Sequence, residues 1–376
     1  MSQQDAIEKF AREKLSRMEA RGLRRVLTPT HRFAAGATER DGARVISFCD
    51  NDYLGLSQDA RVIEAAVHAA KQYGAGAGAS RLVVGDTPMN SAIEQKLAAM
   101  KGLPAARLFG SGYLANIGVI PAIIGPRDLI VIDELSHACL NAGAQLSGAK
   151  IIRFKHNDVD DARQAFEARK DYGRALLITE TVFSMDGDRA PLARLNALAD
   201  EADAWLLTDD AHGFGVLKIE NPAPLQMGTL SKGVGAYGGY ICGPEPLIDL
   251  LISRARSLVY TTGLPPAVLG AVYRALEIIE TEPALGDQAL QNARLFCDLA
   301  GLNAPESAIV PVIVGDAEAA MALSNALLQE GFLVSAIRPP TVPAGTARLR
   351  FTFTAAHHER DIRASAAAFR AARQSG

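Results

Sequence analysis

A lysine follows a short apolar run and precedes a series of glycines. The run is Gln226-Met227-Gly228-Thr229-Leu230-Ser231-Lys232-Gly233, and further glycines stand at positions 235, 238 and 239. Small neighbours leave the amine of Lys232 open to a flat ligand. Lysine forms Schiff bases with aldehyde cofactors, of which pyridoxal phosphate is the commonest. The sequence therefore predicts a cofactor-binding lysine, with an ordinary solvated turn as the alternative.

A carboxylate upstream supports the same chemistry. Residues 204–209 are mostly apolar and indicate a buried strand that ends at Asp209, followed by His212 and further glycines. Pyridoxal chemistry uses a carboxylate at the pyridine nitrogen, because a protonated ring accepts electrons. An aspartate at the end of one strand and a lysine at the end of a later strand would supply the carboxylate and the amine that this cofactor requires. The alternative is an Asp that caps a helix and a lysine on the surface.

Polar side chains follow several predicted strands, each near the point where the strand ends. In open α/β sheets, ligands collect at the carboxyl ends of the strands. We therefore expect one cluster, because scattered surface side chains would not share one edge of the sheet. A lone histidine such as His137 is otherwise often a hydrogen-bonded structural residue. The candidate residues are His137, Glu180, Ser184, Asp209, His212 and Lys232.

Two glycine-rich stretches differ in what they predict. Gly110-Ser111-Gly112 separates a short strand from a helix, and a Gly/Ser turn that opens a helix binds anions through free N–H groups and the helix dipole. A cofactor phosphate would lie there, unless the turn holds no ligand. Residues 74–81 (GAGAGASR) follow a predicted helix instead of a strand, which argues against a dinucleotide site. A flexible loop over a bound substrate is the interpretation we favour.

Charge and cysteine usage exclude several classes of protein. The 376 residues carry 39 basic and 42 acidic side chains, for a formal net charge of −3. Nucleic acid is therefore not an expected partner. The four cysteines lack ligand spacing, which argues against zinc and a disulfide framework and suits a reducing cytoplasm. Residues 1–25 lack the apolar core of a signal peptide, and no run reaches the roughly 18 apolar residues of a membrane helix.

From residue 90 onward, helical and strand patterns alternate, which predicts an α/β fold with a mostly parallel seven-stranded sheet. We expect three parts: an N-terminal helix and short strand over 1–50, a large domain over 51–265, and a linking helix with a smaller α/β domain over 266–376. The expected strands of the large sheet are 106–109, 128–133, 150–154, 175–180, 204–209, 226–230 and 238–242. The smaller domain is expected to have strands 308–314, 332–336 and 347–353 and helices 317–330 and 357–373.

Two arginines in the last predicted strand share one face, because Arg348 and Arg350 stand two residues apart. Either guanidinium could bind a carboxylate with a bidentate fork. A solvated arginine on an edge strand is the alternative. A second basic cluster, at residues 21–25, is interpreted as a solvated helix end that could hold an anionic substrate.

Six segments, taken together and in chain order, resemble the α-oxoamine synthases, which are fold-type I pyridoxal phosphate enzymes. The resemblance covers nearly the whole chain. These enzymes condense an amino acid with an acyl-CoA thioester and lose carbon dioxide. The segments are 51–56 (NDYLGL), 135–137 (LSH), 183–188 (FSMDGD), 209–213 (DDAHG), 229–233 (TLSKG) and 260–266 (YTTGLPP).

The resemblance implies a role for each candidate residue. Lys232 would bind the cofactor covalently and later move the Cα proton, and Asp209 would hold the pyridine nitrogen. His137 would stack on the ring, and His212 would contact the ring hydroxyl and the incoming acyl oxygen. The residues implied at the phosphate are Ser111, Gly112, Tyr113 and Thr229, with Thr262 contributed by the second subunit of a homodimer.

The resemblance also implies the substrates. Residues 337–350 are most similar to family members that join L-alanine to a pimeloyl thioester, carried on CoA or acyl carrier protein, in biotin synthesis. Members that join glycine to acetyl-CoA or succinyl-CoA are the alternative, and a non-catalytic pyridoxal phosphate-binding protein is an alternative from another class. The implied substrate-side residues are Asn51, Glu180, Ser184, Arg350 for the amino acid carboxylate, and Arg24 or Arg25 for the distal carboxylate of the acyl group.

Overall fold

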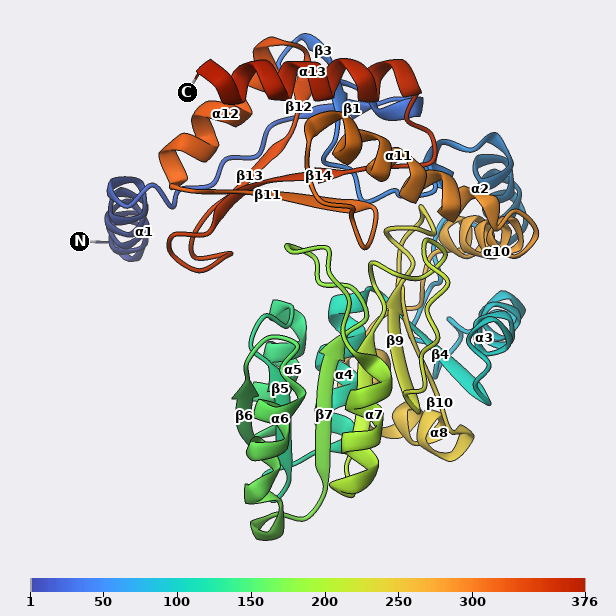
Figure 1. The fold of residues 1–376 in the computed structure, drawn as a ribbon. Coiled ribbons are helices and arrows are strands. Elements are labelled where there is room, and N and C mark those ends of the chain that lie inside the picture. Colours follow the sequence, from blue (N-terminus) through green and yellow to red (C-terminus); the bar gives the residue numbers. More distant parts are fainter. Residues whose placement is uncertain (1, 376) are drawn as a thin grey trace.

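The computed structural model describes residues 2–375, and its centre is a seven-stranded sheet in the order β4-β10-β9-β8-β7-β5-β6 (Figure 1). The strands from β9 to β6 run parallel, whereas β10 is antiparallel to both of its neighbours. The predicted mostly parallel sheet of seven strands is confirmed. The strands are β4 (Ala105–Phe109), β5 (Leu129–Asp133), β6 (Lys150–Phe154), β7 (Ala175–Glu180), β8 (Trp205–Asp209), β9 (Leu225–Thr229) and β10 (Gly239–Gly243).

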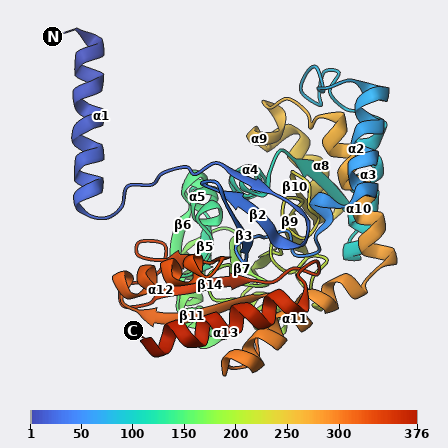
Figure 2. The same cartoon turned by 90° about the horizontal axis from the view of Figure 1, so that it is seen from above.

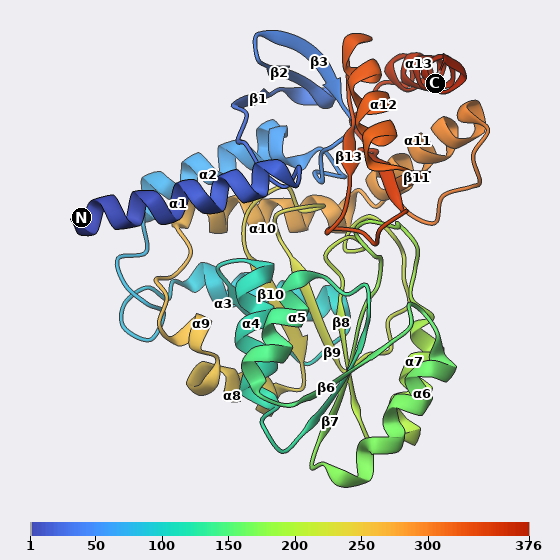
Figure 3. The ribbon, with the colours of Figure 1, turned by 90° about the vertical axis from the view of Figure 1, so that its left-hand side faces the viewer.

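Helices cover both faces of this sheet (Figure 3). Alternate side chains of β5 show how, since Ile130 and Ile132 pack on one face and Leu129 and Val131 on the other. A strand buried on both faces reads as a continuous apolar run, as Leu-Ile-Val-Ile does here. One face is covered by α4 (Gly112–Ile123), α5 (Ala138–Ser147), α8 (Glu245–Arg254) and α9 (Arg256–Val259), and the other by α6 (Val159–Ala165) and α7 (Leu192–Glu201).

The C-terminal unit faces the edge of the large sheet from which the loops after β7 and β8 emerge (Figure 1). Its three-stranded antiparallel sheet has the order β11-β14-β13, so β14 (Ala347–Thr352) is the central strand. A core of phenylalanines, including Phe296, Phe351 and Phe369, holds the sheet and its helices together. The remaining elements are β11 (Ile309–Gly315), β13 (Ser335–Ile337), α11 (Ala284–Ala300), α12 (Ala317–Gln329) and α13 (Glu359–Ser375).

The predicted strand 332–336 divides into two strands that belong to different sheets. β12 (Phe332–Leu333) pairs with β3 (Ala43–Ser47), which also pairs with β2 (Ala37–Arg40), whereas β13 pairs with β14. The short strand β1 (Thr30–Arg32) completes the four-stranded sheet. We therefore propose that residues 37–47 belong with the C-terminal unit 266–376, beside a large domain over 51–265.

The first helix stands away from the rest of the chain (Figure 2). None of the side chains in α1 (Gln3–Ala20) is buried, and its apolar residues Ile7, Phe10, Leu15 and Met18 are exposed. A separate helical layer is formed by α2 (Ala60–Tyr73), α3 (Pro88–Lys101) and α10 (Pro266–Thr281) beside the β4 edge of the sheet. No helix within the described range 2–375 is both long and apolar enough to cross a membrane.

Candidate active site

Three neighbouring strands of the large sheet end in polar side chains that the sequence singled out. Glu180 and Asp209 are the last residues of β7 and β8 and lie side by side in register. Thr229 is the last residue of β9, and Lys232 follows three positions later on the same edge. The expected cluster at the carboxyl edge of the sheet therefore forms, because neighbouring parallel strands end at similar heights.

Asp209 is buried and held in one orientation by two hydrogen bonds. The side-chain amide of Asn116 donates to its Oδ2 at 3.0 Å, and the backbone N–H of Ala211 donates to its Oδ1 at 3.0 Å. Burial raises the pKa of Asp209 to about 6, against the opposing influence of Lys232. A cation beside a buried carboxylate, such as a protonated ring nitrogen, stabilises the ionised form of that carboxylate.

The amine of Lys232 lies among these charges. Burial lowers the pKa of Lys232, while the carboxylates of Asp209 and Glu180 act in the opposite direction. Burial also raises the pKa of Glu180, and the charge of Asp209 adds to that rise. A lysine with a lowered pKa has a larger neutral fraction, which is the form that attacks an aldehyde and accepts a proton.

A buried network joins His212 to the substrate-side residues. The Tyr53 hydroxyl lies 2.6 Å from His212 Nδ1 and 3.1 Å from Asn51 Oδ1. Arg350 donates from Nη2 to Asn51 Oδ1 at 3.2 Å and from Nε to the Ser184 carbonyl at 2.5 Å. Arg350 is 6% exposed on the central strand β14, so the solvated edge-strand alternative is wrong.

We expect Tyr53→Phe to lower kcat/KM about tenfold, because His212 Nδ1 loses its hydroxyl partner in a buried place. Burial lowers the pKa of His212, so the imidazole needs a neutral partner to stay in one tautomer. Tyr240→Phe is the matched control, since the Tyr240 hydroxyl is buried without a hydrogen-bond partner among the described residues. Equal kinetics for the two variants would contradict the assigned role of Tyr53.

His137 is the residue that immediately precedes α5. Its backbone N–H donates to Glu180 Oε1 at 2.6 Å, and its ring is only partly buried. Its Nδ1 lies 2.8 Å from Cys139 Sγ, and Asn116 Nδ2 lies 3.1 Å from the same sulfur. Asn116 therefore connects the Asp209 carboxylate to the group that orients His137. Burial lowers the pKa of His137, which favours a neutral ring that can lie against a flat ligand.

The start of α4 lies against the ends of β9 and β10. Ser111 caps this helix by accepting a hydrogen bond from the Leu114 N–H at 3.1 Å. A Cβ added at Gly112 would lie 3.3 Å from Thr229 Cβ, and one added at Gly239 would lie 2.4 Å from the Gly112 nitrogen. Glycine at these two positions thus permits the close approach. The first N–H groups of a helix have no internal partner and attract anions.

Two predicted residues lie apart from this cluster within one chain. Arg24 is exposed just after the protruding α1 and pairs with Glu19 at 3.1 Å. Thr262 is exposed and forms an isolated bridge with Ser80. Their roles at a distal carboxylate and at the phosphate of a second subunit stay predictions. Tyr113, another residue expected at the phosphate, is also exposed.

Sequence reasoning missed three residues that support the site: Tyr53, Asn116 and Cys139. Asn116 could have been found, because it stands four positions after Gly112 on the helix that starts at the predicted phosphate turn, and therefore on the same helix face. Tyr53 lies within the NDYLGL segment but contacts His212 only through the tertiary fold. Within residues 2–375, no group of His, Cys, Asp and Glu side chains is placed to hold a metal ion.

These residues fit pyridoxal phosphate as a set. The α4 N-terminus would provide N–H groups for the phosphate, Asp209 a carboxylate for the ring nitrogen, and Lys232 an amine for the aldehyde. An α/β chain that presents these groups at one edge of a seven-stranded sheet has the architecture of the fold-type I transferases. The chain belongs to the aminotransferase class I and II family, which its residues 43–369 match.

Relatives of known identity narrow the class. The chain is 57% identical over 365 residues to an 8-amino-7-oxononanoate synthase of Methylorubrum extorquens, covering 97% of this chain and 95% of that one. Among solved structures it is similar to a serine palmitoyltransferase from S. paucimobilis with bound pyridoxal phosphate–myriocin aldimine, at TM-score 0.90, 28% identity, and 100% and 99% coverage. It also resembles 8-amino-7-oxononanoate synthase from Francisella tularensis, at TM-score 0.75, 27% identity, and 88% and 98% coverage.

Proposed function

We propose that this chain is an 8-amino-7-oxononanoate synthase. It joins L-alanine to a pimeloyl thioester of CoA or acyl carrier protein and releases carbon dioxide and the free carrier, in biotin synthesis. The observation that carries the proposal is the identity of 57% to such an enzyme over 97% of the chain. The geometry supports it, since Lys232, Asp209 and Arg350 provide an amine, a ring carboxylate and a guanidinium for the amino acid.

The predicted site residues would contact different parts of the cofactor. Asp209 would hold the ring nitrogen, His137 the ring face and His212 the ring hydroxyl. Ser111, Gly112, Tyr113 and Thr229 would hold the phosphate, and Ser184 would lie beside the cofactor. When bound, pyridoxal phosphate supplies an electron sink for the negative charge that develops on the amino acid Cα. The buried Asn116–Asp209 hydrogen bond holds the carboxylate in one orientation, which supports this role.

Lys232 moves the proton. Its lowered pKa leaves the amine ready to take the Cα proton of L-alanine and to return a proton after carbon dioxide has left. Arg350 holds the amino acid carboxylate through charge-assisted hydrogen bonds until that group departs. Asn51 and Glu180 line the substrate side. Positioned proton transfer of this kind contributes roughly a hundred- to ten-thousandfold to the rate.

A cavity beside Ser184 suits an acyl chain. Its volume is about 440 Å³, and its walls come from residues 134–136, 183–186 and 339–344. Its lining combines apolar side chains with polar ones: the apolar residues are Leu135, Phe183, Met185, Pro339, Pro340, Val342, Pro343 and Ala344, and the polar residues are Glu134, Ser136, Ser184, Asp186 and Thr341. The proline-rich loop 339–344 therefore forms one wall of the space next to the turn that carries Ser184.

We further propose a homodimer with a shared active site and a cytoplasmic location. Exposed apolar side chains gather on segments next to the predicted phosphate turn, which supports a second copy there; they are Leu82, Val83, Val84, Tyr113 and Tyr260. Thr262 lies within one of these segments. All four cysteines are free thiols, which supports a reducing compartment.

Release of free CoA thiol by the protein loaded with pyridoxal phosphate tests the function. L-Alanine with pimeloyl-CoA is compared with glycine plus acetyl-CoA and glycine plus succinyl-CoA. We expect thiol release with the alanine pair. Release only with a glycine pair would assign a sister synthase such as glycine C-acetyltransferase or 5-aminolevulinate synthase. Cofactor binding without turnover, on CoA or on carrier-protein thioesters, would support a non-catalytic pyridoxal phosphate-binding protein.

A further inference from the structure

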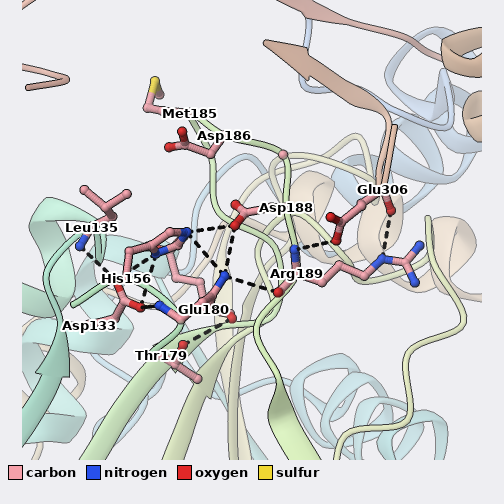
Figure 4. Close-up of polar contacts among 12 residues, drawn as sticks. Asp133, Leu135, His156, Thr179, Glu180, Met185, Asp186, Asp188, Arg189 and Glu306 are labelled. Atoms are coloured by element: carbon pink, nitrogen blue, oxygen red, sulfur yellow. Dashed lines mark hydrogen bonds and ion pairs between the residues drawn. The ribbon is translucent and has the colours of Figure 1, made fainter. Parts of the chain in front are cut away.

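His156 lies between the carboxylates of Asp133 and Asp188 (Figure 4). Its Nδ1 is 3.1 Å from Asp133 Oδ1, and its Nε2 is 2.7 Å from Asp188 Oδ2. Asp133 ends strand β5 and its side chain is fully buried, whereas Asp188 belongs to the turn after β7. The backbone N–H of His156 donates to Glu134 Oε1 at 3.2 Å. One imidazole thus ties the end of β5 to the turn after β7.

The turn over residues 182–189 is held tightly on this side. Val182 and Arg189 form a bridge across its base, and the Phe183 N–H donates to the Asp188 carbonyl at 3.0 Å. Asn157 adds a hydrogen bond from Nδ2 to Asp188 Oδ2 at 2.9 Å. The ring of Phe183 packs edge-on against His156, with centroids 4.3 Å apart. His156 therefore sets the position of the turn through both polar and aromatic contacts.

The opposite side of the same turn holds the arginines of β14. The Ser184 carbonyl accepts the hydrogen bond from Arg350 Nε at 2.5 Å, and Asp186 pairs with Arg348. Ser307, which precedes β11, donates to the Gly187 carbonyl at 2.7 Å. A shift of the turn would therefore move the carbonyl that orients the Arg350 guanidinium, although His156 itself touches no substrate-side residue.

The charges explain why histidine is suited to this place. Burial lowers the pKa of His156, but the hydrogen bonds and charges of Asp133 and Asp188 outweigh burial and raise it to about 10. At neutral pH the imidazolium donates from both ring nitrogens, one to each carboxylate. A neutral side chain would leave two carboxylates, one of them fully buried, without a shared cation.

We propose that His156 is a positioning residue for the amino acid substrate: by bridging Asp133 and Asp188 it fixes the turn whose Ser184 carbonyl orients Arg350. This inference rests on the proposed function, because it takes Arg350 as the group that binds the amino acid carboxylate. His156 lies outside the site itself. We expect it to affect the affinity for the amino acid and not the proton transfer at Lys232.

Amino acid binding to the loaded protein tests the proposal. The dissociation constants of pyridoxal phosphate and of L-alanine are measured from cofactor absorption for the unmodified protein, His156→Gln and Asp188→Asn. We expect His156→Gln to weaken L-alanine binding about ten- to a hundredfold, since a displaced guanidinium loses its alignment. The same variant should bind the cofactor within threefold of the unmodified protein. Asp188→Asn should show a smaller effect in the same direction.

Asp128→Asn is the matched control for a general loss of stability. Asp128 stands at the other end of β5, where it accepts hydrogen bonds from the Gly125 N–H at 2.8 Å and from Arg174 at 2.7 Å. This variant should leave L-alanine affinity unchanged even if it unfolds at a lower temperature. An L-alanine affinity of His156→Gln within twofold of the unmodified protein would overturn the inference. Failure of thiol release with normal alanine binding would overturn the proposed function alone.

Unfolding as a function of pH provides a second readout. Because the folded pKa of His156 is raised from about 6.5 to about 10, its stabilisation is complete below pH 6.5 and is lost as pH rises toward 10. The difference in Tm between the unmodified protein and His156→Gln should therefore shrink steadily over this interval. A difference that stays constant with pH would show that the charged bridge does not form.

Discussion

Lys232→Ala is expected to retain the fold and to lose both the covalent attachment of pyridoxal phosphate and the activity. The side chain is only half-buried, and no described residue shares a hydrogen bond or ion pair with its amine, so its removal breaks no structural contact of that kind. Loss of the proton carrier alone should cost roughly a hundred- to ten-thousandfold in rate. Because the amine is also the group that links to the aldehyde, the remaining turnover should be near the detection limit.

Borohydride trapping followed by intact-mass measurement checks this expectation. The unmodified protein should gain one reduced cofactor per chain, and Lys232→Ala should gain none. Lys218→Ala is the control, because Lys218 is an exposed lysine whose partner among the described residues is Asp287, at 3.1 Å. Trapped cofactor at another lysine of the Lys232→Ala protein would show that the attachment site is misassigned.

Asp209→Asn should have the second-largest effect, because it removes the charge beside the expected ring nitrogen while keeping the shape of the side chain. Asparagine keeps one acceptor oxygen, so it can retain the hydrogen bond from Asn116 but not also the one from the Ala211 N–H; the fold should persist with this one local loss. A neutral partner no longer favours a protonated ring, and the rate should fall about a hundredfold or more. Cofactor affinity should fall as well, since the charge-assisted hydrogen bond to the ring is lost.

Asp210→Asn separates this effect from the simple loss of a buried carboxylate. Asp210 is the next residue and is also buried, but its carboxylate faces Lys101 at 2.6 Å and Thr181. We expect this variant to lose stability, because it leaves the buried Lys101 amine without its charged partner. Its cofactor absorption should stay normal. If both variants lose activity equally with the cofactor bound, Asp209 has no special role at the ring.

Some features of the site follow from local sequence patterns. A strand buried on both faces is continuously apolar, so the runs that end at Glu180 and Asp209 could be recognised with their polar last residues. The Gly/Ser turn before α4 is likewise a local signal for a helix start. These predictions succeed because strand ends in one parallel sheet share an edge, whatever the sequence distance between them.

Other features depend on contacts between distant segments. Asn116 lies 93 positions from Asp209, and Tyr53 lies 159 positions from His212. No periodicity in one segment shows which side chain of another segment will complete its hydrogen bonds. The division of residues 332–336 between two sheets has the same cause, because β3 from the N-terminal segment pairs with only the first part of that run.

The sequence by itself determined the α/β class and which polar residues end the strands, and it predicted the chemistry of Lys232 and Asp209, because each follows from apolar patterns and residue types over a few positions. Only the tertiary structure decided how those groups are held: that Arg350 is buried on a central strand, that Asn116 orients Asp209, and that His156 ties the turn at Ser184 to β5. The reason is that buried polar groups must find partners wherever the fold brings them, and those partners come from remote parts of the chain.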